Sequence, residues 1–296
     1  MDGFEKAIGL LPQRLRREAE AFRGEQVEEI RLRTGHRATL LYNGCEQPLT
    51  AEAVSEGELQ KLLEQATGAS LHSSVSALAE GYLSYRGLRV GVCGTAVRHG
   101  GQLSGFRNLS SAAIRIPREC RGICDGLLRQ LYRDGFENTL LISRPGGGKT
   151  TALRELIRRL SDGGTRLGVV DERNELSATE GAKAQFDLGA HSDVLVGVPK
   201  AEGAMMLLRG MNPQVLAVDE ISNARDVEAM AQLYGCGAGL LASAHASGWR
   251  ELNQRPIYRE LLRQGIFKIL IVISGTGDKR RYVAERLQSC ECLELC

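Results

Sequence analysis

Eight consecutive residues combine glycines with a lysine and a threonine, in the order Ser143-Arg144-Pro145-Gly146-Gly147-Gly148-Lys149-Thr150. A short apolar run precedes them, and a helical pattern over Thr150–Leu160 follows. Glycines between a strand and a helix let successive backbone N–H groups converge on an anion at the helix N-terminus. The pattern predicts a Walker A phosphate loop, with Lys149 on the β- and γ-phosphates and the Thr150 hydroxyl on Mg²⁺. The alternative is a glycine-rich turn that merely contains a lysine.

The first position of this loop departs from the usual pattern, because Ser143 replaces the glycine or alanine found there. A small side chain at the end of a strand still fits, so we expect the site to be retained. The residues expected to contact ATP are Ser143, Arg144, Pro145, Gly146, Gly147, Gly148, Lys149, Thr150 and Thr151.

Two carboxylates close another apolar run, in which Val215–Val218 leads to Asp219 and Glu220. Parallel strands bring their carboxyl ends to one edge of a sheet, so both side chains are expected near the loop. Asp219 would hold Mg²⁺ through water, and Glu220 would accept a proton from the attacking water. Taken alone, the run also fits a buried strand that ends in a solvated acidic turn.

Polar groups follow two more strand patterns. Gly239–Ser243 leads to His245, which could contact the γ-phosphate or the attacking water and report hydrolysis, or could be a packing residue. Val169–Val170 leads to residues 171–173, Asp-Glu-Arg, whose carboxylates could assist the metal or water, or form a salt-bridged turn. We place His245 with Glu220 and Lys149 in the candidate catalytic group.

Phosphoryl transfer also needs a cation beyond Lys149, and oligomeric NTPases commonly take an arginine from a neighbouring subunit. The sequence does not rank the candidates, which are Arg107, Arg115, Arg209 and Arg225.

The pattern of predicted secondary structure changes across residues 117–137. Before them, short strand patterns and one capped helix indicate an α+β module, and after them apolar runs alternate with helical patterns, as in a parallel sheet with helices on both faces. We therefore predict an α/β fold: a smaller α+β N-terminal domain (1–116), a linker helix region (117–137) and a P-loop NTPase core with a mainly parallel sheet (138–296).

The predicted elements come from apolar periodicity and from turn and capping signals. The expected strands are Val27–Arg33, Thr39–Tyr42, Tyr82–Tyr85, Leu88–Cys93, Ala112–Ile116, Thr139–Ile142, Leu167–Val170, Val215–Val218, Gly239–Ser243 and Lys268–Ile273. The expected helices are one capped by Ser55 and Glu58 and ending near Gly68, then Thr150–Leu160, Glu202–Arg209 and Ala224–Tyr234. Asn43-Gly44 indicates a hairpin turn.

Composition bears on the expected binding partners, the cellular location and the state of the cysteines. Thirty-eight basic and 36 acidic side chains give a net charge of +2, so we expect no nucleic acid partner. Without an export signal or an apolar run long enough to cross a bilayer, we expect a cytoplasmic protein with reduced cysteines. Two cysteine groups could still form a metal or redox cluster, although neither has paired Cys-x-x-Cys spacing: Cys120 with Cys124, and Cys290 with Cys292 and Cys296.

More specific motifs lie outside the phosphate loop. They are Val169-Val170-Asp171-Glu172-Arg173-Asn174-Glu175, Pro199-Lys200-Ala201-Glu202-Gly203, Pro213-Gln214-Val215, Val218-Asp219-Glu220-Ile221, Ala244-His245, Glu29-Ile30-Arg31-Leu32-Arg33, Arg89-Val90-Gly91-Val92 and Ile114-Arg115-Ile116. Over nearly its full length, the chain resembles the stage III sporulation AA family, which is related to the type II and type IV secretion ATPases.

This resemblance implies a RecA-like core and a cytoplasmic ATPase, a hexameric ring peripherally associated with membrane proteins of a sporulation channel complex. It also implies that Lys149 and Thr150 bind nucleotide, that Asp219 and Glu220 form the Walker B pair, that residues 171–175 form an acidic box and that His245 forms a histidine box. Two other functions stay open: a nucleic-acid-associated P-loop ATPase, and a scaffold that binds ATP with little turnover.

Overall fold

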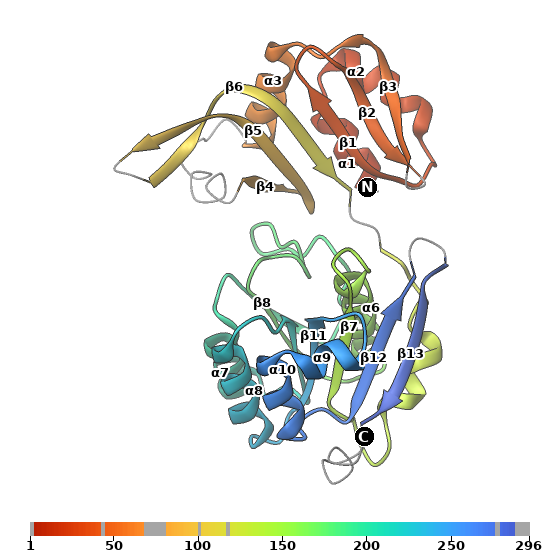
Figure 1. The fold of residues 1–296 in the computed structure, drawn as a ribbon, viewed down its shortest axis with the longest axis vertical. Coiled ribbons are helices and arrows are strands. Elements are labelled where there is room, and N and C mark those ends of the chain that lie inside the picture. Colours follow the sequence, from red (N-terminus) through yellow and green to blue (C-terminus); the bar gives the residue numbers. More distant parts are fainter. Residues whose placement is uncertain are drawn as a thin grey trace. The chain divides into compact units, whose positions relative to one another are not determined.

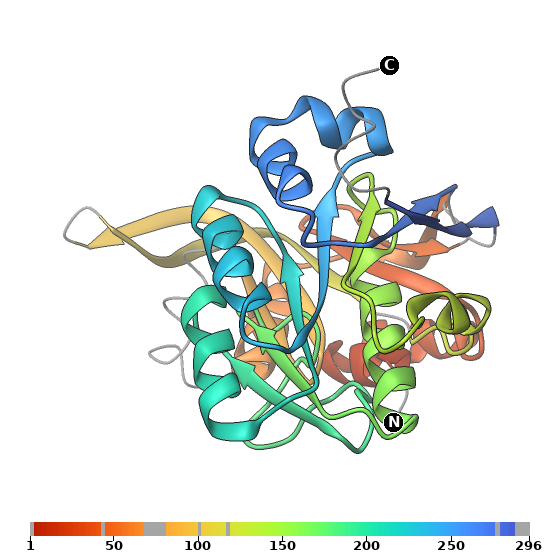
Figure 2. The ribbon, with the colours of Figure 1, turned by 90° about the horizontal axis from the view of Figure 1, so that it is seen from below.

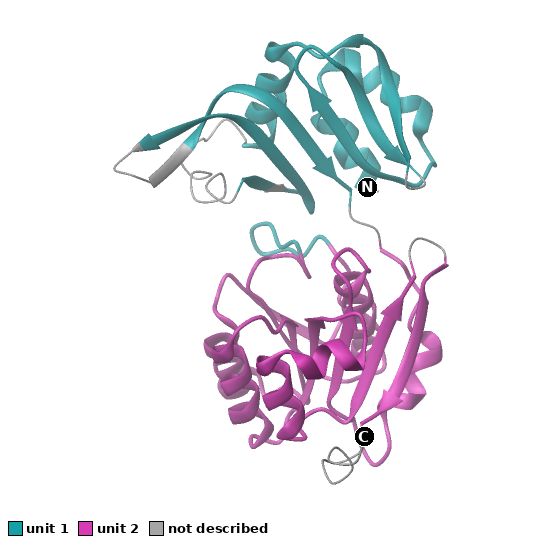
Figure 3. Ribbon diagram, viewed as in Figure 1, with its two compact units in different colours: residues 1–118, 178–185 teal, residues 119–177, 186–296 magenta. Residues whose placement is uncertain are grey.

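The computed structural model describes residues 3–42, 45–67, 81–99, 102–116, 119–275 and 279–287. The chain forms two compact units (Figure 3): unit 1 comprises residues 1–118 and 178–185, and unit 2 comprises residues 119–177 and 186–296. Each unit has its own sheet and apolar core. Among the helices described, none combines the length and apolar character that crossing a bilayer requires.

In its described residues, unit 1 is an antiparallel sheet with the helices α1, α2, η1 and α3 (Figure 1). Its elements are α1 (Gly3–Leu10), α2 (Gln13–Ala19), η1 (Glu20–Phe22), β1 (Val27–Arg33), β2 (Arg37–Tyr42), β3 (Cys45–Ala53), α3 (Glu56–Ala66), β4 (Tyr82–Tyr85), β5 (Leu88–His99) and β6 (Gln102–Arg115). The strand order is β3-β2-β1-β6-β5-β4.

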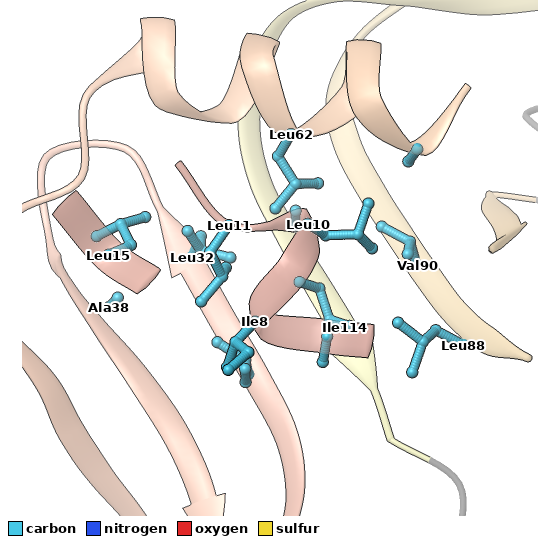
Figure 4. Packing of buried hydrophobic residues seen from close by; sticks show 14 of the residues in the cluster. Ile8, Leu10, Leu11, Leu15, Leu32, Ala38, Leu62, Leu88, Val90 and Ile114 are labelled. Atoms are coloured by element: carbon cyan, nitrogen blue, oxygen red, sulfur yellow. The ribbon is translucent and has the colours of Figure 1, made fainter. Parts of the chain in front are cut away.

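The core of unit 1 lies between these helices and the sheet (Figure 4), where Leu10 of α1 and Leu62 of α3 are fully buried with Leu32 and Ile114 of the strands. The predicted capping box at the start of α3 is confirmed, because the Ser55 hydroxyl accepts from the Glu58 amide and the Glu58 carboxylate accepts from the Ser55 amide. Such a cap contributes about 1 kcal/mol.

The strand predictions in unit 1 are correct for β1 and β4, two residues short for β2 and much too short for β5 and β6, and β3 was not predicted. Strands β5 and β6 continue as a long ribbon, with Ala96 opposite Phe106, through polar residues that lack apolar alternation. The predicted turn at Asn43-Gly44 and the helix end at Gly68 lie outside the described residues.

Unit 2 carries a seven-stranded sheet in the order β13-β12-β7-β11-β10-β8-β9, parallel except for β13. Its strands are β7 (Thr139–Ser143), β8 (Leu167–Asp171), β9 (Ser192–Val196), β10 (Val215–Glu220), β11 (Gly239–His245), β12 (Ile269–Ser274) and β13 (Arg281–Arg286). Its helices are α5 (Asp125–Leu128), η3 (Arg129–Leu131), α6 (Lys149–Asp162), α7 (Lys200–Met211), α8 (Ala224–Tyr234), α9 (Trp249–Gln254) and α10 (Pro256–Arg263).

Helices cover both faces of this sheet (Figures 1 and 2). Helices α5 and α6 share one apolar cluster with the inward side chains of the strands, and helices α7 to α10 share another on the opposite face. The predicted strands and helices of this half are confirmed to within a few residues, but β9 and β13 were not predicted.

Candidate functional site

The loop between β7 and α6 is shaped by glycines. Gly146 and Gly148 have φ angles of 72° and 96°, in the left-handed region that glycine tolerates best. A Cβ on Gly147 would lie 2.6 Å from Ser143 Oγ, so a side chain would not fit there. Gly148 is the N-cap of α6 and provides no side-chain cap. The first-turn amides of α6 are therefore well placed to bind an anion.

Ser143, the unusual first residue of the loop, is buried at the end of β7. Its hydroxyl donates to the Arg144 carbonyl at 2.8 Å, so the additional polar group is satisfied locally. Arg144 and Pro145 are exposed. Thr151 lies further along and lines a small pocket beside Arg154.

The sheet order brings three strand ends together. Strand β11 lies between β7 and β10, and its register places His245 beside Ser143 of the phosphate-loop strand. On its other side, Ser243 is in register with Glu220. A single strand thus separates the phosphate loop from the acidic strand end, and His245 lies at the end of that strand.

Hydrogen bonds through His245 connect Lys149, the first residue of α6, with Glu220 at the end of β10. Lys149 Nζ lies 2.6 Å from His245 Nδ1, and His245 Nε2 lies 2.9 Å from Glu220 Oε2. Because an ammonium can only donate, Nδ1 accepts, and the ring proton on Nε2 is donated to the carboxylate. Burial lowers the pKa of Lys149, while the nearby carboxylates of Glu220, Asp219 and Glu175 oppose that shift.

Asp219 is the most buried carboxylate of the Walker B-like strand end, with 8% of its surface exposed. Successive side chains of a strand point to opposite faces of the sheet. Val218 packs on the face covered by α7 to α10, and Ala217 on the face covered by α6, so Asp219 lies on the α6 face. Burial, followed by the charges of Glu175, Asp171 and Glu220, raises its pKa to about 6. Burial and these like charges disfavour the ionised form of Asp219, so a cation bound beside it would stabilise that form.

Replacing Asp219 with Asn is expected to stabilise the nucleotide-free protein at pH 8 and to leave its stability unchanged near pH 4. The folded-state pKa of about 6 exceeds the ordinary 3.8, so ionisation of Asp219 opposes folding increasingly as the pH rises from 4 to 6. The expected gain at pH 8 is about 1–3 kcal/mol. Urea unfolding without Mg²⁺ measures it, with the exposed Asp134→Asn as control. Equal unfolding midpoints for Asp219→Asn and wild type at pH 8 would contradict this expectation.

The residues after β8 form a loop organised by Asp171. This buried carboxylate accepts from the amides of Glu175, Leu176 and Ser177 and from the Ser177 hydroxyl, at 2.7–3.0 Å. Such a carboxylate fixes the backbone of its own loop. Within the candidate acidic box, Asp171 is thus engaged by the loop, whereas Glu175 lies close enough to raise the pKa of Asp219.

Two cations, Arg154 and Lys200, hold this loop in place; the sequence marked Lys200 only as part of a family motif and did not mark Arg154. Arg154 of α6 is 6% exposed and donates to the carbonyls of Glu175 and Leu176, with its guanidinium 3.8 Å from the centre of the Phe186 ring. Lys200, at the start of α7, pairs with Glu172 at 2.5 Å. Both residues lie on helices, and their partners are at least 21 residues away in the sequence. These contacts can therefore be recognised only from the fold.

The four arginines considered as additional cations are all exposed. Arg107 and Arg115 belong to unit 1, where Arg115 pairs with Glu29 at 3.2 Å. Arg209 lies in the last turn of α7, and Arg225 in the first turn of α8. The described contacts of Arg209 and Arg225 include none with the phosphate loop of their own unit.

The described cysteines are not grouped as a metal site would require. Cys124 is buried and its thiol lies 3.6 Å from the Ala152 carbonyl of α6. Burial raises its pKa to about 12, which keeps it a thiol. In the described part of the chain, no three acidic, His or Cys side chains gather as metal ligands, and Cys290, Cys292 and Cys296 lie outside that part.

Comparison with solved structures identifies the fold. The structure superposes on the Legionella pneumophila ATPase DotB with a TM-score of 0.61 and 17% identity, covering 93% of this chain and 80% of that one. It also superposes on the pilus retraction motor PilT with bound ADP, with a TM-score of 0.63 and 18% identity over 93% and 83% of the two chains. This protein has the RecA-like α/β fold of the secretion ATPases, preceded by an α+β part.

Sequence comparison identifies the family. The family described as sporulation stage III, protein AA, matches residues 3–284. Stage III sporulation protein AA of Bacillus subtilis (strain 168) is 34% identical over 255 residues, which are 84% of this chain and 83% of that protein. The chain belongs to the sporulation stage III protein AA family, as its motifs predicted.

Proposed function

We propose that this protein is a Mg²⁺-dependent ATPase that converts ATP to ADP and phosphate. The observation that supports this most is the hydrogen-bonded chain from Lys149 through His245 to Glu220, beside the buried Asp219. It connects a phosphate-binding lysine to a carboxylate at hydrogen-bonding distances. A binding-only protein has no need for that connection.

Each residue has a distinct task in this proposal. The loop amides and Lys149 bind the phosphates, and Glu220 accepts the proton of the attacking water. His245 orients Glu220 and contacts the γ-phosphate or the water. Bound Mg²⁺ supplies positive charge against the phosphate oxygens, with the Thr150 hydroxyl and Asp219 as the groups that would hold it.

The sequence feature that favours an ATP-binding scaffold with little turnover is the unusual Ser143 at the start of the loop. Because its side chain is buried and its hydroxyl bonds to the adjacent carbonyl, Ser143 leaves the loop intact. We therefore favour turnover. A nucleic-acid-associated ATPase would instead show strong stimulation of phosphate release by single-stranded DNA, and we expect none.

Replacing Lys149 with Ala is expected to weaken binding of Mg²⁺-ATP by about 10–100-fold and to abolish phosphate release. The ammonium makes charge-assisted bonds to phosphate, each contributing about 1.5–3 kcal/mol. Equilibrium binding of a fluorescent ATP analogue and phosphate release by the purified protein measure both effects. The matched control is Lys268→Ala, an exposed lysine of the same unit. Equal phosphate release from wild type and Lys149→Ala would refute the ATPase proposal.

We further propose that the ATPase acts as a homo-oligomeric ring, a hexamer, located in the cytoplasm at membrane proteins of a sporulation channel complex, and that it energises this complex. Membership of the sporulation family and the likeness in fold to DotB and PilT support this role. The mass in solution, with and without a slowly hydrolysed ATP analogue, tests the ring. A monomer under both conditions would contradict it.

A further inference from the structure

Arg280 lies against the phosphate loop of its own chain. A Cβ built on Gly148 would be 3.2 Å from both Cζ and Nε of Arg280 and 3.5 Å from its Nη1. Gly148 directly precedes Lys149 and is the N-cap of α6. The guanidinium therefore packs closely over the loop at Gly148, where a side chain would press against it.

The hairpin of β12 and β13 explains how a residue so distant in the chain reaches the loop. Strand β12 is parallel to β7 and pairs with it, so both strands end at the same edge of the sheet. Ser274 at the end of β12 is in register with Arg281 at the start of β13, which places Arg280 just beyond that edge. Gly275 permits the close return, because its Cβ would lie 2.5 Å from the Lys279 carbonyl oxygen.

The bonding of Arg280 differs from that of other arginines around this helix. Arg154 donates to two carbonyls, and Arg158 pairs with Glu155 and Asp162. The Nε of Arg280, by contrast, is buried and has no hydrogen-bond partner among the residues that the structure describes. A desolvated guanidinium N–H without an acceptor is costly, so an acceptor that binds here would be held strongly.

Phosphate oxygens are the acceptors best matched to this position. They are anionic, they bind the amides and lysine of such a loop, and their geometry fits a guanidinium. We infer that Arg280 binds the phosphate groups of the nucleotide held by its own phosphate loop. This inference rests on the proposed nucleotide binding, and it supplies from within the same chain the second cation that the sequence did not locate.

Competition binding tests this role. Fluorescent ADP is bound to the full-length protein with Mg²⁺ and then displaced by unlabelled ADP or by inorganic pyrophosphate, which has phosphates but no base. For Arg280→Met, both competitors are expected to bind about 10–100-fold more weakly than for wild type, as for one lost charge-assisted contact. The affinities of Arg280→Lys should fall between those of wild type and Arg280→Met. The control Arg281→Met, at an exposed neighbouring position, should bind both competitors as wild type does.

Thermal unfolding without nucleotide separates binding from a structural role. Because Arg280 Nε has no partner in the described protein, Arg280→Met should unfold at the wild-type temperature or slightly above, and should lose only the stabilisation by ADP. A lower nucleotide-free unfolding temperature would overturn the inference in favour of structural support for the loop.

The competition results discriminate further. If Arg280→Met bound both competitors with wild-type affinity, the inference would be overturned. Weaker binding of ADP alone, with pyrophosphate unaffected, would also overturn it, because it would indicate contact with the base or ribose. If the wild-type protein bound neither competitor, the proposed function itself would fail. Wild-type binding that Lys149→Ala weakens and Arg280→Met does not would reject only the inference.

Discussion

Glu220→Gln is expected to lower the rate of ATP hydrolysis by about 10²–10⁴-fold while preserving ATP binding, because it removes the proposed general base. Glutamine has nearly the same shape, and its amide oxygen can still accept from His245 Nε2, which lies 2.9 Å from Glu220 Oε2. The hydrogen-bonded chain to Lys149 therefore survives, and only the capacity to take a proton is lost.

Single-turnover phosphate release and equilibrium binding of an ATP analogue separate the two effects of Glu220→Gln. ATP affinity should stay within about threefold of wild type or rise slightly, because one negative charge near the phosphates is removed. Glu228→Gln, an exposed position on α8, makes the same chemical change away from the site. Hydrolysis at the wild-type rate by Glu220→Gln would exclude Glu220 as the base.

Asp171→Ala is expected to destabilise the protein by about 3–5 kcal/mol, because it leaves three amides of one loop without their acceptor. Those amides belong to Glu175, Leu176 and Ser177, and the last two residues are fully buried. This destabilisation should lower the unfolding temperature by about 10 °C. Urea and thermal unfolding without nucleotide measure the effect directly.

The comparison variant for Asp171→Ala is Asp187→Ala. Asp187 is 45% exposed and pairs with Arg121 at 3.0 Å, so its loss should cost under about 1 kcal/mol. If Asp171→Ala left the nucleotide-free stability unchanged and weakened only Mg²⁺-dependent binding, Asp171 would have a direct role at the metal instead of in the loop.

Much of the fold could be predicted because its central elements carry strong local signals. The apolar run Val215–Val218 is enclosed by neighbours on both sides, and helix α8 was predicted with its correct bounds. Three strands were not predicted, and all three are edge strands: β3 in the sheet of unit 1, and β9 and β13 in the sheet of unit 2. Strand β9 is only half-buried, and β13 has charged and exposed residues, so neither shows the continuous apolar run of a buried parallel strand.

The candidate site could be predicted only as a set of residues. The candidate phosphate loop and the acidic strand end can be recognised from local sequence, because the residues that form each of them are adjacent in the chain. The insertion of β11 between β7 and β10, which lets His245 contact both Lys149 and Glu220, depends on strand order. Arg154 and Arg280 act through contacts between distant segments, and no local motif marks them. Lys200 belongs to a recognised motif, but its pairing with Glu172 also joins distant segments.

The contact between Cys124 and the phosphate-loop helix makes this thiol an intrinsic reporter. Its sulfur is fully shielded and lies against the Ala152 carbonyl, two residues beyond Thr150. A thiol-modifying reagent can therefore reach it only when the segment before α5 separates from α6. The rate of Cys124 alkylation thus measures, without an introduced label, how often the support of the phosphate loop opens in the native protein.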